Sequence, residues 1–354
     1  MKQGRSLKDA KAERAAKKRR AMRRKRSLVL LIEVLVLASL IGTGYVLTKY
    51  KKIQQEQLQE SDIQVNEGAK QEKYRTVALF GVDSREGEMG VGTYADTIMI
   101  ATIDKETKEI KLVSVYRDLL TMQLNRRIGK ANQSYFNGGP LETINMLNKN
   151  LDLDVKDYIT VDFKAMAGAV DLLGGIEVYL SENEAGEINR YIDETAMVVG
   201  KDAKRVKEGK QTLDGVQTVT YARVGKNISN DYGRTECQRL IVEKLIEKIK
   251  HQNVMTLDNI INQVFPQVAT SFTLEELLGL TADVMQYNLS ETRGYPFEKT
   301  EVVFEKVQNA VIPAGSVENI EELHEFLYPK NEYEVSETVK ETVKQIDGQI
   351  QNKE

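Results

Sequence analysis

The stretch that decides the fold is residues 75–116, RTVALFGVDSREGEMGVGTYADTIMIATIDKETKEIKLVSVY. It contains three apolar runs, at 75–82, 96–103 and 109–116, and each has the length of a buried β-strand. The charged segment DKETKE lies between the second and third runs and predicts a hairpin turn. These 42 residues therefore predict the centre of a buried β-sheet.

Helical and extended patterns alternate after this stretch. Gly174-Gly175 is a stop signal for the helix that precedes it, and the segment 234–250 has strongly amphipathic spacing. Strands interleaved with helices predict an α/β fold with a mixed central sheet flanked by helices. Further strands are expected at 158–163 and 176–180, and helices at 140–150, 164–173, 212–224, 234–250, 273–287 and 316–328.

The N-terminus differs sharply from the rest of the chain. Residues 1–26 hold 13 basic and two acidic side chains, and a largely apolar run follows from Leu28 to Leu47. Such a run is long enough to cross a bilayer, and its basic flank predicts a cytoplasmic N-terminus. We therefore expect a single transmembrane helix at 27–48 and a domain outside the cell membrane. A cleaved signal peptide and a cytoplasmic nucleic-acid-binding arm are the alternatives.

The remaining segments complete the expected organisation. Residues 49–73 are polar and are interpreted as a stalk or linker, residues 74–333 as the extracellular domain, and residues 334–354 as a loose polar tail. The first 26 residues carry a charge of +11, which leaves −14 for the remainder of a chain whose net charge is −3. The outer part therefore lacks the basic footprint of a nucleic-acid-binding domain.

Several kinds of site are excluded or disfavoured by composition. Cys237 is the only cysteine, so the chain forms no internal disulfide, and His251 and His324 are the only histidines. Neither histidine lies in a context that suggests a nucleophilic triad. The chain has no C-x-x-C or H-E-x-x-H spacing, so a structural or proteolytic zinc site is not expected.

Charged and polar residues gather instead where the predicted strands end, which is where open α/β sheets place their sites. Carboxylates there can hold Mg²⁺, and guanidinium groups can bind phosphate oxygens through paired hydrogen bonds. Each also has a plainer interpretation, as a turn, a helix cap, a solvated surface pair or, for Tyr135 and Phe136, a core side chain. The candidates at the strand ends are Asp83, Arg85, Asp96, Arg117 and Asp118. Lys130 and Asn132 lie in a loop with Tyr135, and the candidates far downstream are Arg223, Asp231, Arg234 and Gln238.

The order of the motifs around these residues resembles the LytR-CpsA-Psr family. The motifs are GVDSR, ADT, VSVYRD, GKANQSY, LDGVQTVTYAR and NDYGRTECQ, spread over roughly residues 74–250. The resemblance implies an α/β/α domain on a membrane anchor. It also implies a Mg²⁺-assisted phosphotransferase that moves teichoic acid or capsular polysaccharide from an undecaprenyl-pyrophosphate carrier to peptidoglycan. In this family the prenyl tail lies in an apolar tunnel through the domain.

The same resemblance implies roles for individual residues. Asp83 and Asp96 correspond to the metal-binding carboxylates. Arg117, Asp231 and Arg234 correspond to the catalytic group. The residues expected to bind the pyrophosphate are Arg85, Lys130, Asn132, Arg223 and Gln238.

Three arginine positions of the family are replaced in this chain. Tyr94, Gly225 and Cys237 occupy them, and Lys226 and Arg239 are the neighbouring cations that could compensate. Each lost charge-assisted contact to a phosphate costs about 1.5–3 kcal/mol. The replacements leave open a second hypothesis, in which the protein binds a polyprenyl phosphate and acts as a scaffold or regulator of envelope assembly without transferring anything. A redox or nucleophilic role for Cys237 is a weaker alternative to simple space filling.

Overall fold

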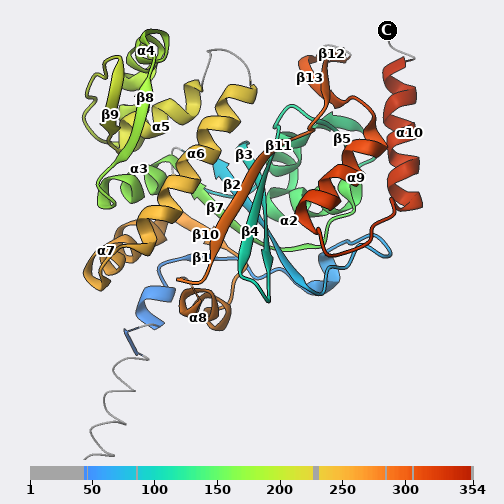
Figure 1. Ribbon diagram of the computed structural model, residues 1–354, viewed down its shortest axis with the longest axis horizontal. Coiled ribbons are helices and arrows are strands. Elements are labelled where there is room, and N and C mark those ends of the chain that lie inside the picture. The colour runs from blue at the N-terminus through green and yellow to red at the C-terminus, as the bar shows by residue number, and fades with distance from the viewer. Residues whose placement is uncertain are drawn as a thin grey trace, which may run out of the picture. The chain divides into compact units, whose positions relative to one another are not determined.

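A seven-stranded mixed sheet forms the centre of the domain in the computed structural model, with strand order β1-β10-β7-β2-β3-β4-β11 (Figure 1). The structure describes residues 44–45, 47–84, 87–225, 231–283, 285–304 and 307–351. The α/β fold with a mixed, helix-flanked sheet predicted from the sequence is confirmed. The sheet strands are β1 (Gln54–Gln55), β2 (Tyr74–Val82), β3 (Ala95–Asp104), β4 (Glu109–Val115), β7 (Val155–Asp162), β10 (Val268–Thr270) and β11 (Asn288–Tyr295).

The pairing of the strands explains why the sheet is mixed. β2, β3 and β4 form consecutive antiparallel pairs, whereas β2 pairs parallel with β7, and β4 pairs parallel with β11. Phe80 pairs with Ile98 across β2 and β3, and Met99 pairs with Ser114 across β3 and β4. The ends of β2, β3 and β4 consequently bring the segments after residue 82, before residue 95 and after residue 115 to one edge of the sheet.

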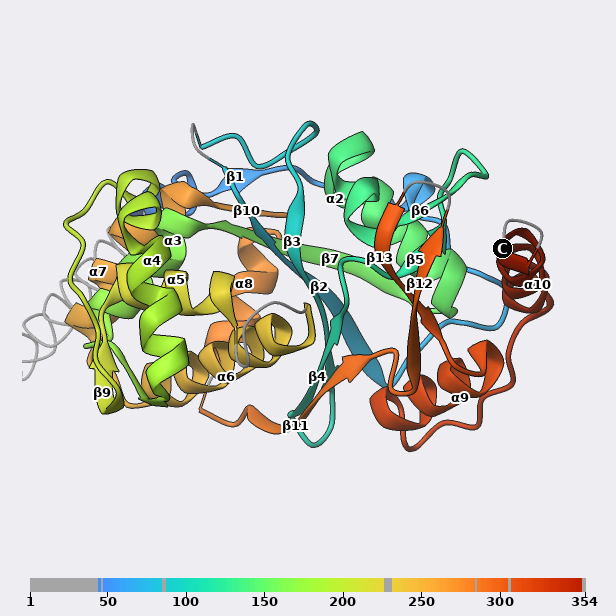
Figure 2. The same ribbon diagram turned by 90° about the horizontal axis from the view of Figure 1, so that it is seen from above.

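Helices cover both faces of the sheet (Figures 1 and 2). One face packs Phe80, Ile98 and Ile100 against Leu147 and Leu323 in the largest apolar cluster. The helices on this side are α2 (Ala131–Leu151), α9 (Ser316–Leu327) and α10 (Glu337–Gln351). The other side carries α3 (Phe163–Leu172), α4 (Glu182–Val199), α5 (Gly215–Val224), α6 (Asp231–Lys250), α7 (Val254–Val264) and α8 (Leu274–Ala282).

Three two-stranded ribbons complete the domain. The ribbon of β8 (Ile176–Leu180) and β9 (Gly209–Leu213) shares an apolar cluster with α3 to α6. The other two ribbons pair β5 (Leu120–Met122) with β6 (Ile128–Lys130), and β12 (Lys299–Phe304) with β13 (Val307–Pro313). Two short 3₁₀ helices, η1 (Glu60–Asp62) and η2 (Phe265–Gln267), lie in the connections.

Capping residues set where the helices near the site begin. Asp162 ends β7, and its carboxylate accepts a hydrogen bond from the backbone N–H of Ala165 at the start of α3. Ser181 and Glu184 form a capping box at the start of α4, and Asp214 and Gln217 form another at the start of α5. These local bonds satisfy N–H groups that a helix end otherwise leaves unpaired.

The segment expected as a stalk, 49–73, packs on the domain from residue 52 onward. β1 pairs with β10, the backbone N–H of Gln64 donates to Asn145, and that of Gln71 donates to Asp154. The expectation of a free-standing linker was therefore wrong for this part. Its polar composition misled the prediction because a polar side chain can also bond within a fold, as the Asn66 amide does to the end of α2 and to Asp152.

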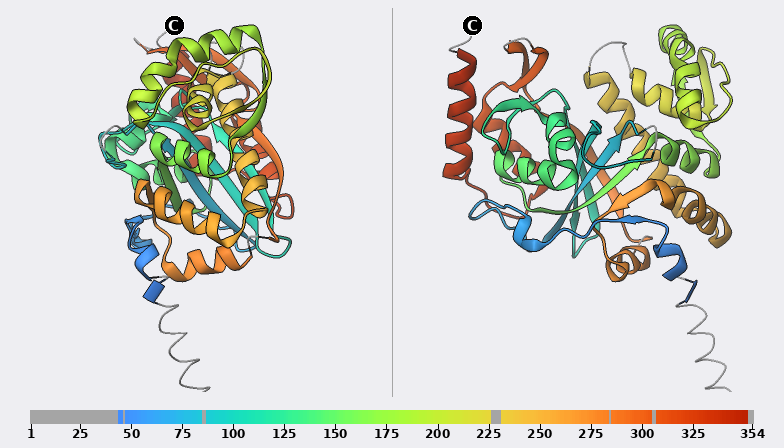
Figure 3. Two further views of the ribbon diagram at one scale, coloured as in Figure 1. Left: turned by 90° about the vertical axis from the view of Figure 1, so that its left-hand side faces the viewer. Right: turned by 180° about the vertical axis from the view of Figure 1, so that it is seen from behind.

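The tail expected to be loose, 334–354, also forms structure, because α10 occupies most of it (Figure 3). Val339 belongs to the main apolar cluster, and Ile350 lies in a smaller one with Leu120 and Ala310. A repeat of apolar residues every three or four positions, at 339, 343, 346 and 350, gives the helix an apolar face.

Both of these segments meet at Asp152, a buried residue with positive φ at the end of α2. Its carboxylate accepts hydrogen bonds from Asn66 at 2.6 Å, from the Tyr333 hydroxyl at 2.8 Å, and from the backbone N–H and hydroxyl of Ser336 at 2.8 and 2.7 Å. The carboxylate therefore ties the N-terminal and C-terminal segments of the domain to one helix end.

The predicted transmembrane segment, 27–48, lies outside the described residues except at 44–45 and 47–48. Among the residues that the structure describes, no helix is both long and apolar enough to span a bilayer.

Candidate functional site

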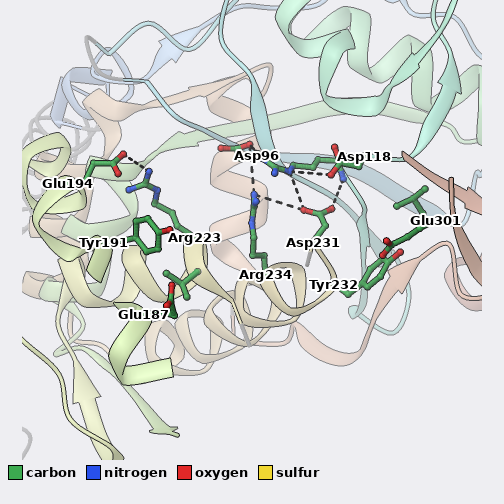
Figure 4. Close-up of a pocket in the computed structure, with 13 residues that line it drawn as sticks. Asp96, Asp118, Glu187, Tyr191, Glu194, Arg223, Asp231, Tyr232, Arg234 and Glu301 are labelled. Carbon is green, nitrogen blue, oxygen red and sulfur yellow. Dashed lines mark hydrogen bonds and ion pairs between the residues drawn. The ribbon is translucent and has the colours of Figure 1, made fainter. Parts of the chain in front are cut away.

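Three cavities meet at Asp96, the second residue of β3. The polar cavity, of about 550 Å³, is lined by charged residues of the sheet edge, α4 and α6 (Figure 4). The apolar cavity, of about 220 Å³, lies between the sheet and helices α3, α5 and α6. The outer cavity, of about 570 Å³, opens beside residues 83–84 and 88–94. A ligand with apolar and charged parts could therefore extend across Asp96.

The polar cavity brings together residues from distant parts of the sequence. Asp96 comes from the start of β3, Arg117 from just after β4, and Asp231 and Arg234 from the first turn of α6. Arg223 reaches the same cavity from the last turn of α5. Asp118, which follows Arg117, also lines this cavity, so six of the residues predicted from the sequence converge on one space.

Arg117 links the carboxylates of this group. One of its terminal nitrogens lies 2.6 Å from Oδ1 of Asp96, and its Nε lies 3.2 Å from Oδ1 of Asp231. The backbone N–H of Arg117 donates to Oδ2 of Asp231 at 3.1 Å. Asp231 thus holds Arg117 by both its main chain and its side chain.

Burial sets the ionisation of this network. It raises the pKa of Asp231, whose side chain is 8% exposed, while Arg234 and Arg117 oppose that shift. Burial works to lower the pKa of Arg117, but Asp96 and Asp231 outweigh it and raise that pKa above its ordinary value. The carboxylates therefore keep the guanidinium charged and oriented.

Arg234 is less well paired than Arg117. Its terminal nitrogen lies 4.0 Å from Oδ1 of both Asp96 and Asp231, and its buried Nε has no hydrogen-bond partner among the described residues. Burial and the nearby charge of Arg117 lower the pKa of Arg234. Arg234 lines both the polar and the apolar cavity, so it lies at the junction between them.

Arg223 is engaged by α4. It donates to the Glu194 carboxylate at 2.8 Å and to the Thr195 hydroxyl at 2.9 Å. Figure 4 shows that Glu194 and Arg223 face each other, and that this pair lies on the opposite side of the cavity from Asp231 and Arg234. To bind a phosphate, Arg223 would have to share or exchange its bond with Glu194.

The apolar cavity begins at the same residues. Asp96, Arg223 and Arg234 line both cavities, and the walls beyond them are apolar side chains such as Leu79, Met99 and Ile159. Gln238 also lines this cavity, and its buried side-chain oxygen has no hydrogen-bond partner within the described part of the chain. Gln238 therefore lies beside the apolar cavity and not among the residues of the polar one.

Two predicted metal ligands, Asp83 and Asp96, share the outer cavity with Asn132. The buried Oδ1 of Asp83 has no hydrogen-bond partner among the described residues. Within the same residues, no cluster of three or more His, Cys, Asp or Glu side chains could enclose a metal. Mg²⁺ is commonly bound through one or two carboxylates together with substrate phosphates, so this donor set fits it.

Lys130, one of the residues predicted to bind the pyrophosphate, is not among the described residues that line the three cavities. The Lys130 ammonium lies 2.7 Å from the Asp118 carboxylate, and that carboxylate lies 3.9 Å from Nε of Arg117. Arg85 lies outside the described residues, as does Lys226.

The three replaced arginine positions have different surroundings. Tyr94 lines the outer cavity, whereas Cys237 is fully buried in the cluster of α3 to α6 and contacts Tyr221. Arg239, a candidate compensating cation, lies beside Tyr116 and Gly294 and lines none of the three cavities. Space filling therefore describes Cys237 well.

Gly225 is constrained by its backbone and by Arg234. Its φ is +81°, and a Cβ added there would lie 2.5 Å from the backbone nitrogen of Arg234. We expect Gly225→Arg, although it restores an arginine that the resemblance leads us to expect, to lower the free energy of unfolding by about 1–3 kcal/mol. Urea unfolding of Gly225→Arg beside Gly186→Arg, which meets no atom within 4 Å, checks this. A Gly225→Arg protein as stable as the wild type would contradict it.

The sequence analysis missed one wall of the polar cavity. Glu187, Tyr191 and Glu194 come from α4, which was not predicted, and Glu301 comes from β12. The capping box at Ser181 and Glu184, with Gly200 at the helix end, was the available signal for α4.

Fold and site together define a class of protein: an α/β domain with an apolar cavity that opens on a cluster of arginines and carboxylates. Comparisons with known proteins make this assignment more specific. Residues 41–324 match the LytR_cpsA_psr family, and because the match covers most of the chain, the protein belongs to this family.

Curated relatives include two teichoic acid transferases named TagU. That of Bacillus subtilis is 25% identical over 278 residues, which cover 74% of this chain and 84% of the relative. That of Bacillus licheniformis is 28% identical over 205 residues, which cover 57% of this chain and 61% of the relative. Both bear the name polyisoprenyl-teichoic acid–peptidoglycan teichoic acid transferase.

Solved structures show the same fold. Protein gbs0355 of Streptococcus agalactiae matches with a TM-score of 0.63 and 20% identity, over 75% of this chain and 91% of that one. TagT bound to LI-WTA matches with a TM-score of 0.57 and 20% identity, over 73% and 90%.

Proposed function

We propose that this protein is a phosphotransferase that attaches a glycopolymer, of the teichoic acid or capsular polysaccharide type, from an undecaprenyl-pyrophosphate carrier to peptidoglycan. The observation that carries the proposal is the junction at Asp96, Arg223 and Arg234, where an apolar cavity opens into a charged one. A lipid pyrophosphate has this same division into an apolar chain and an anionic head. The names of the TagU relatives support the reaction class.

The residues of the polar cavity have different roles in the proposed reaction. Arg117 and Arg234 hold the diphosphate and stabilise the negative charge that develops on its oxygens during transfer. Arg223 adds a third guanidinium when it exchanges Glu194 for phosphate. Both oxygens of Asp231 face Arg117 or Arg234, so we assign Asp231 the positioning of these arginines in preference to proton removal.

In the proposed reaction the glycan is transferred together with the phosphate to which it is attached. The acceptor sugar hydroxyl forms a bond to the phosphorus that carries the glycan, and the bond from that phosphorus to the lipid phosphate oxygen breaks. The products are a glycan joined to peptidoglycan by a phosphodiester and a polyprenyl monophosphate. The departing phosphate, whose second pKa is about 6, can accept the hydroxyl proton.

Asp83 and Asp96 would hold Mg²⁺, supported by the unpartnered Oδ1 of Asp83 and the shared outer cavity. When bound, the ion would neutralise charge on the diphosphate oxygens. Asn132 borders the same cavity, and the Asp118–Lys130 pair lies next to Arg117.

We further propose that the domain works on the outer face of the cell membrane, with residues 27–48 as a single transmembrane anchor and the N-terminus in the cytoplasm. The basic segment 1–26 followed by the apolar run supports this orientation.

The test is transfer of a lipid-pyrophosphate glycan to peptidoglycan oligomers by the purified full-length protein, with Mg²⁺ titrated. We expect Asp83→Asn, which removes one charge and keeps the shape, to raise the Mg²⁺ concentration for half-maximal transfer about tenfold. Asp202→Asn, at an exposed carboxylate that lines none of the three cavities, is the control. Absence of turnover with Mg²⁺ present, together with an Asp96→Ala protein that supports normal envelope assembly in cells, would overturn the proposal.

One observation favours a second function, a polyprenyl-phosphate-binding scaffold or regulator without transfer. Arg223 is held by Glu194 and Thr195, and Tyr94, Gly225 and Cys237 supply no guanidinium. Co-purification of a prenyl phosphate with no turnover would support this function over the enzyme.

A further inference from the structure

Tyr94, which lines the outer cavity, belongs to an exposed aromatic pair. The rings of Tyr94 and Phe136 stack with centroids 4.6 Å apart and an interplanar angle of 21°. Tyr94 is 46% exposed and Phe136 is 38% exposed. Large aromatic side chains that remain in water at the edge of a cavity often mark a place where a ligand binds.

The pair is held in place by the buried start of α2. The backbone N–H of Gly92 donates to the carbonyl of Phe136 at 2.9 Å, and the Tyr135 hydroxyl donates to the carbonyl of Met89 at 2.6 Å. Tyr135 itself is fully buried. The segment that carries Tyr94 is thus fixed to α2 at two points, so a ligand would meet an aromatic surface that is already ordered.

The rest of the outer cavity is polar. Ser84 and Thr93 line it with hydroxyl groups, and Asn132 lines it with an amide. An aromatic face beside hydrogen-bonding side chains suits a pyranose ring, whose C–H groups pack on the aromatic face while its hydroxyls bond to the polar groups.

We propose that Tyr94, backed by Phe136, forms the subsite for a sugar ring of the acceptor glycan strand. This inference rests on the proposed function. The apolar cavity shares Asp96, Arg223 and Arg234 with the polar cavity but only Asp96 with the outer one. A lipid in the apolar cavity therefore leads its diphosphate and glycan into the polar cavity, which leaves the outer cavity for the acceptor. Asp96 and Arg117 border both spaces, so an acceptor hydroxyl there would lie next to the diphosphate.

Chitotetraose, a soluble β-1,4-linked N-acetylglucosamine tetramer, is the probe. The chain has no tryptophan, so Tyr94→Trp in the full-length protein gives a single fluorophore at the proposed subsite. We expect its emission to shift to shorter wavelength and saturate as chitotetraose is added.

By calorimetry, Tyr94→Ala and Phe136→Ala should bind the probe on the order of tenfold more weakly, as is common for tyrosine anchors at binding surfaces. Tyr94→Phe should bind normally, and Tyr179→Ala, at a 70% exposed tyrosine on β8, is the matched control.

A second measurement separates acceptor from donor. Tyr94→Ala should bind a polyprenyl pyrophosphate in detergent as tightly as the wild type and, if transfer occurs, should raise the KM for the acceptor with little change in kcat. Loss of donor binding, unchanged chitotetraose binding by folded Tyr94→Ala, or absence of probe binding by the wild type would each overturn the subsite. Failure of transfer with tyrosine-dependent probe binding intact would count against the proposed function and leave the subsite standing.

Discussion

Arg234→Ala is expected to lower kcat/KM for glycan transfer by about 10²–10³, the effect of removing one well-placed donor to a developing oxyanion. The reason is its position: its side chain is 18% exposed, it borders both the polar and the apolar cavity, and its Nε is unpartnered among the described residues. Arg234→Lys should recover only part of the loss, because lysine keeps the charge without the planar pair of donors. Turnover of a synthetic lipid-pyrophosphate donor measures both.

The control for this prediction is Arg205→Ala, which removes an exposed arginine that pairs with Asp193 away from the cavities. Thermal unfolding of each variant separates a loss of chemistry from a loss of fold. A folded Arg234→Ala protein with turnover within threefold of the wild type would show that the diphosphate is held elsewhere.

Acidification is expected to destabilise the fold through His324, which is buried on α9. Its Nε2 lies 2.8 Å from the carbonyl oxygen of Leu151, and its ring stacks on Tyr333 at 3.4 Å between centroids. Burial lowers the pKa of His324 from 6.5 to about 4, against weaker opposing effects of the Leu151 hydrogen bond and Asp152. A hydrogen bond to a carbonyl needs the proton on Nε2, so the folded state holds the neutral ring.

The sign follows from proton binding. Between pH 6.5 and about 4 the unfolded chain binds a proton that the folded chain rejects, so the free energy of unfolding is highest above pH 6.5 and falls as the pH drops. The loss from this group approaches roughly 3 kcal/mol. Urea unfolding at several pH values should show a shallower decline for His324→Gln than for the wild type. His251→Gln, at the exposed second histidine, should follow the wild type, and equal declines in all three proteins would contradict the prediction.

The centre of the sheet could be predicted because its signals are local. β2, β3 and β4 coincide with the three apolar runs to within about one residue, since each run is buried and ends at a turn or a charged segment. β11 escaped prediction because it pairs only with β4, and its polar residues Glu291 and Arg293 bond to each other. An edge strand of this kind lacks the apolar run that marks a buried one.

Only the site residues that lie at the ends of strands could be predicted from the strand pattern. Asp96 and Arg117 follow from the sheet edge, whereas Asp231 and Arg234 were placed by the family resemblance and their contact with Arg117 needed the fold. The bond from Glu194 to Arg223 depends on how α4 packs on α5, which no local pattern of the sequence encodes. Phe136 lies next to the buried Tyr135 in sequence, yet only the structure shows that it stacks on Tyr94 at the surface.

The Asp152 carboxylate has a practical consequence for working with this protein. Asn66 near the start of the domain and Tyr333 and Ser336 near its end all donate hydrogen bonds to this one carboxylate. The carboxylate therefore connects the two ends of the domain. Proteolytic trimming at either end would leave a buried carboxylate short of donors and loosen the opposite end. A fragment for crystallisation should accordingly start at residue 52 and retain α10, even though neither segment reaches the cavities.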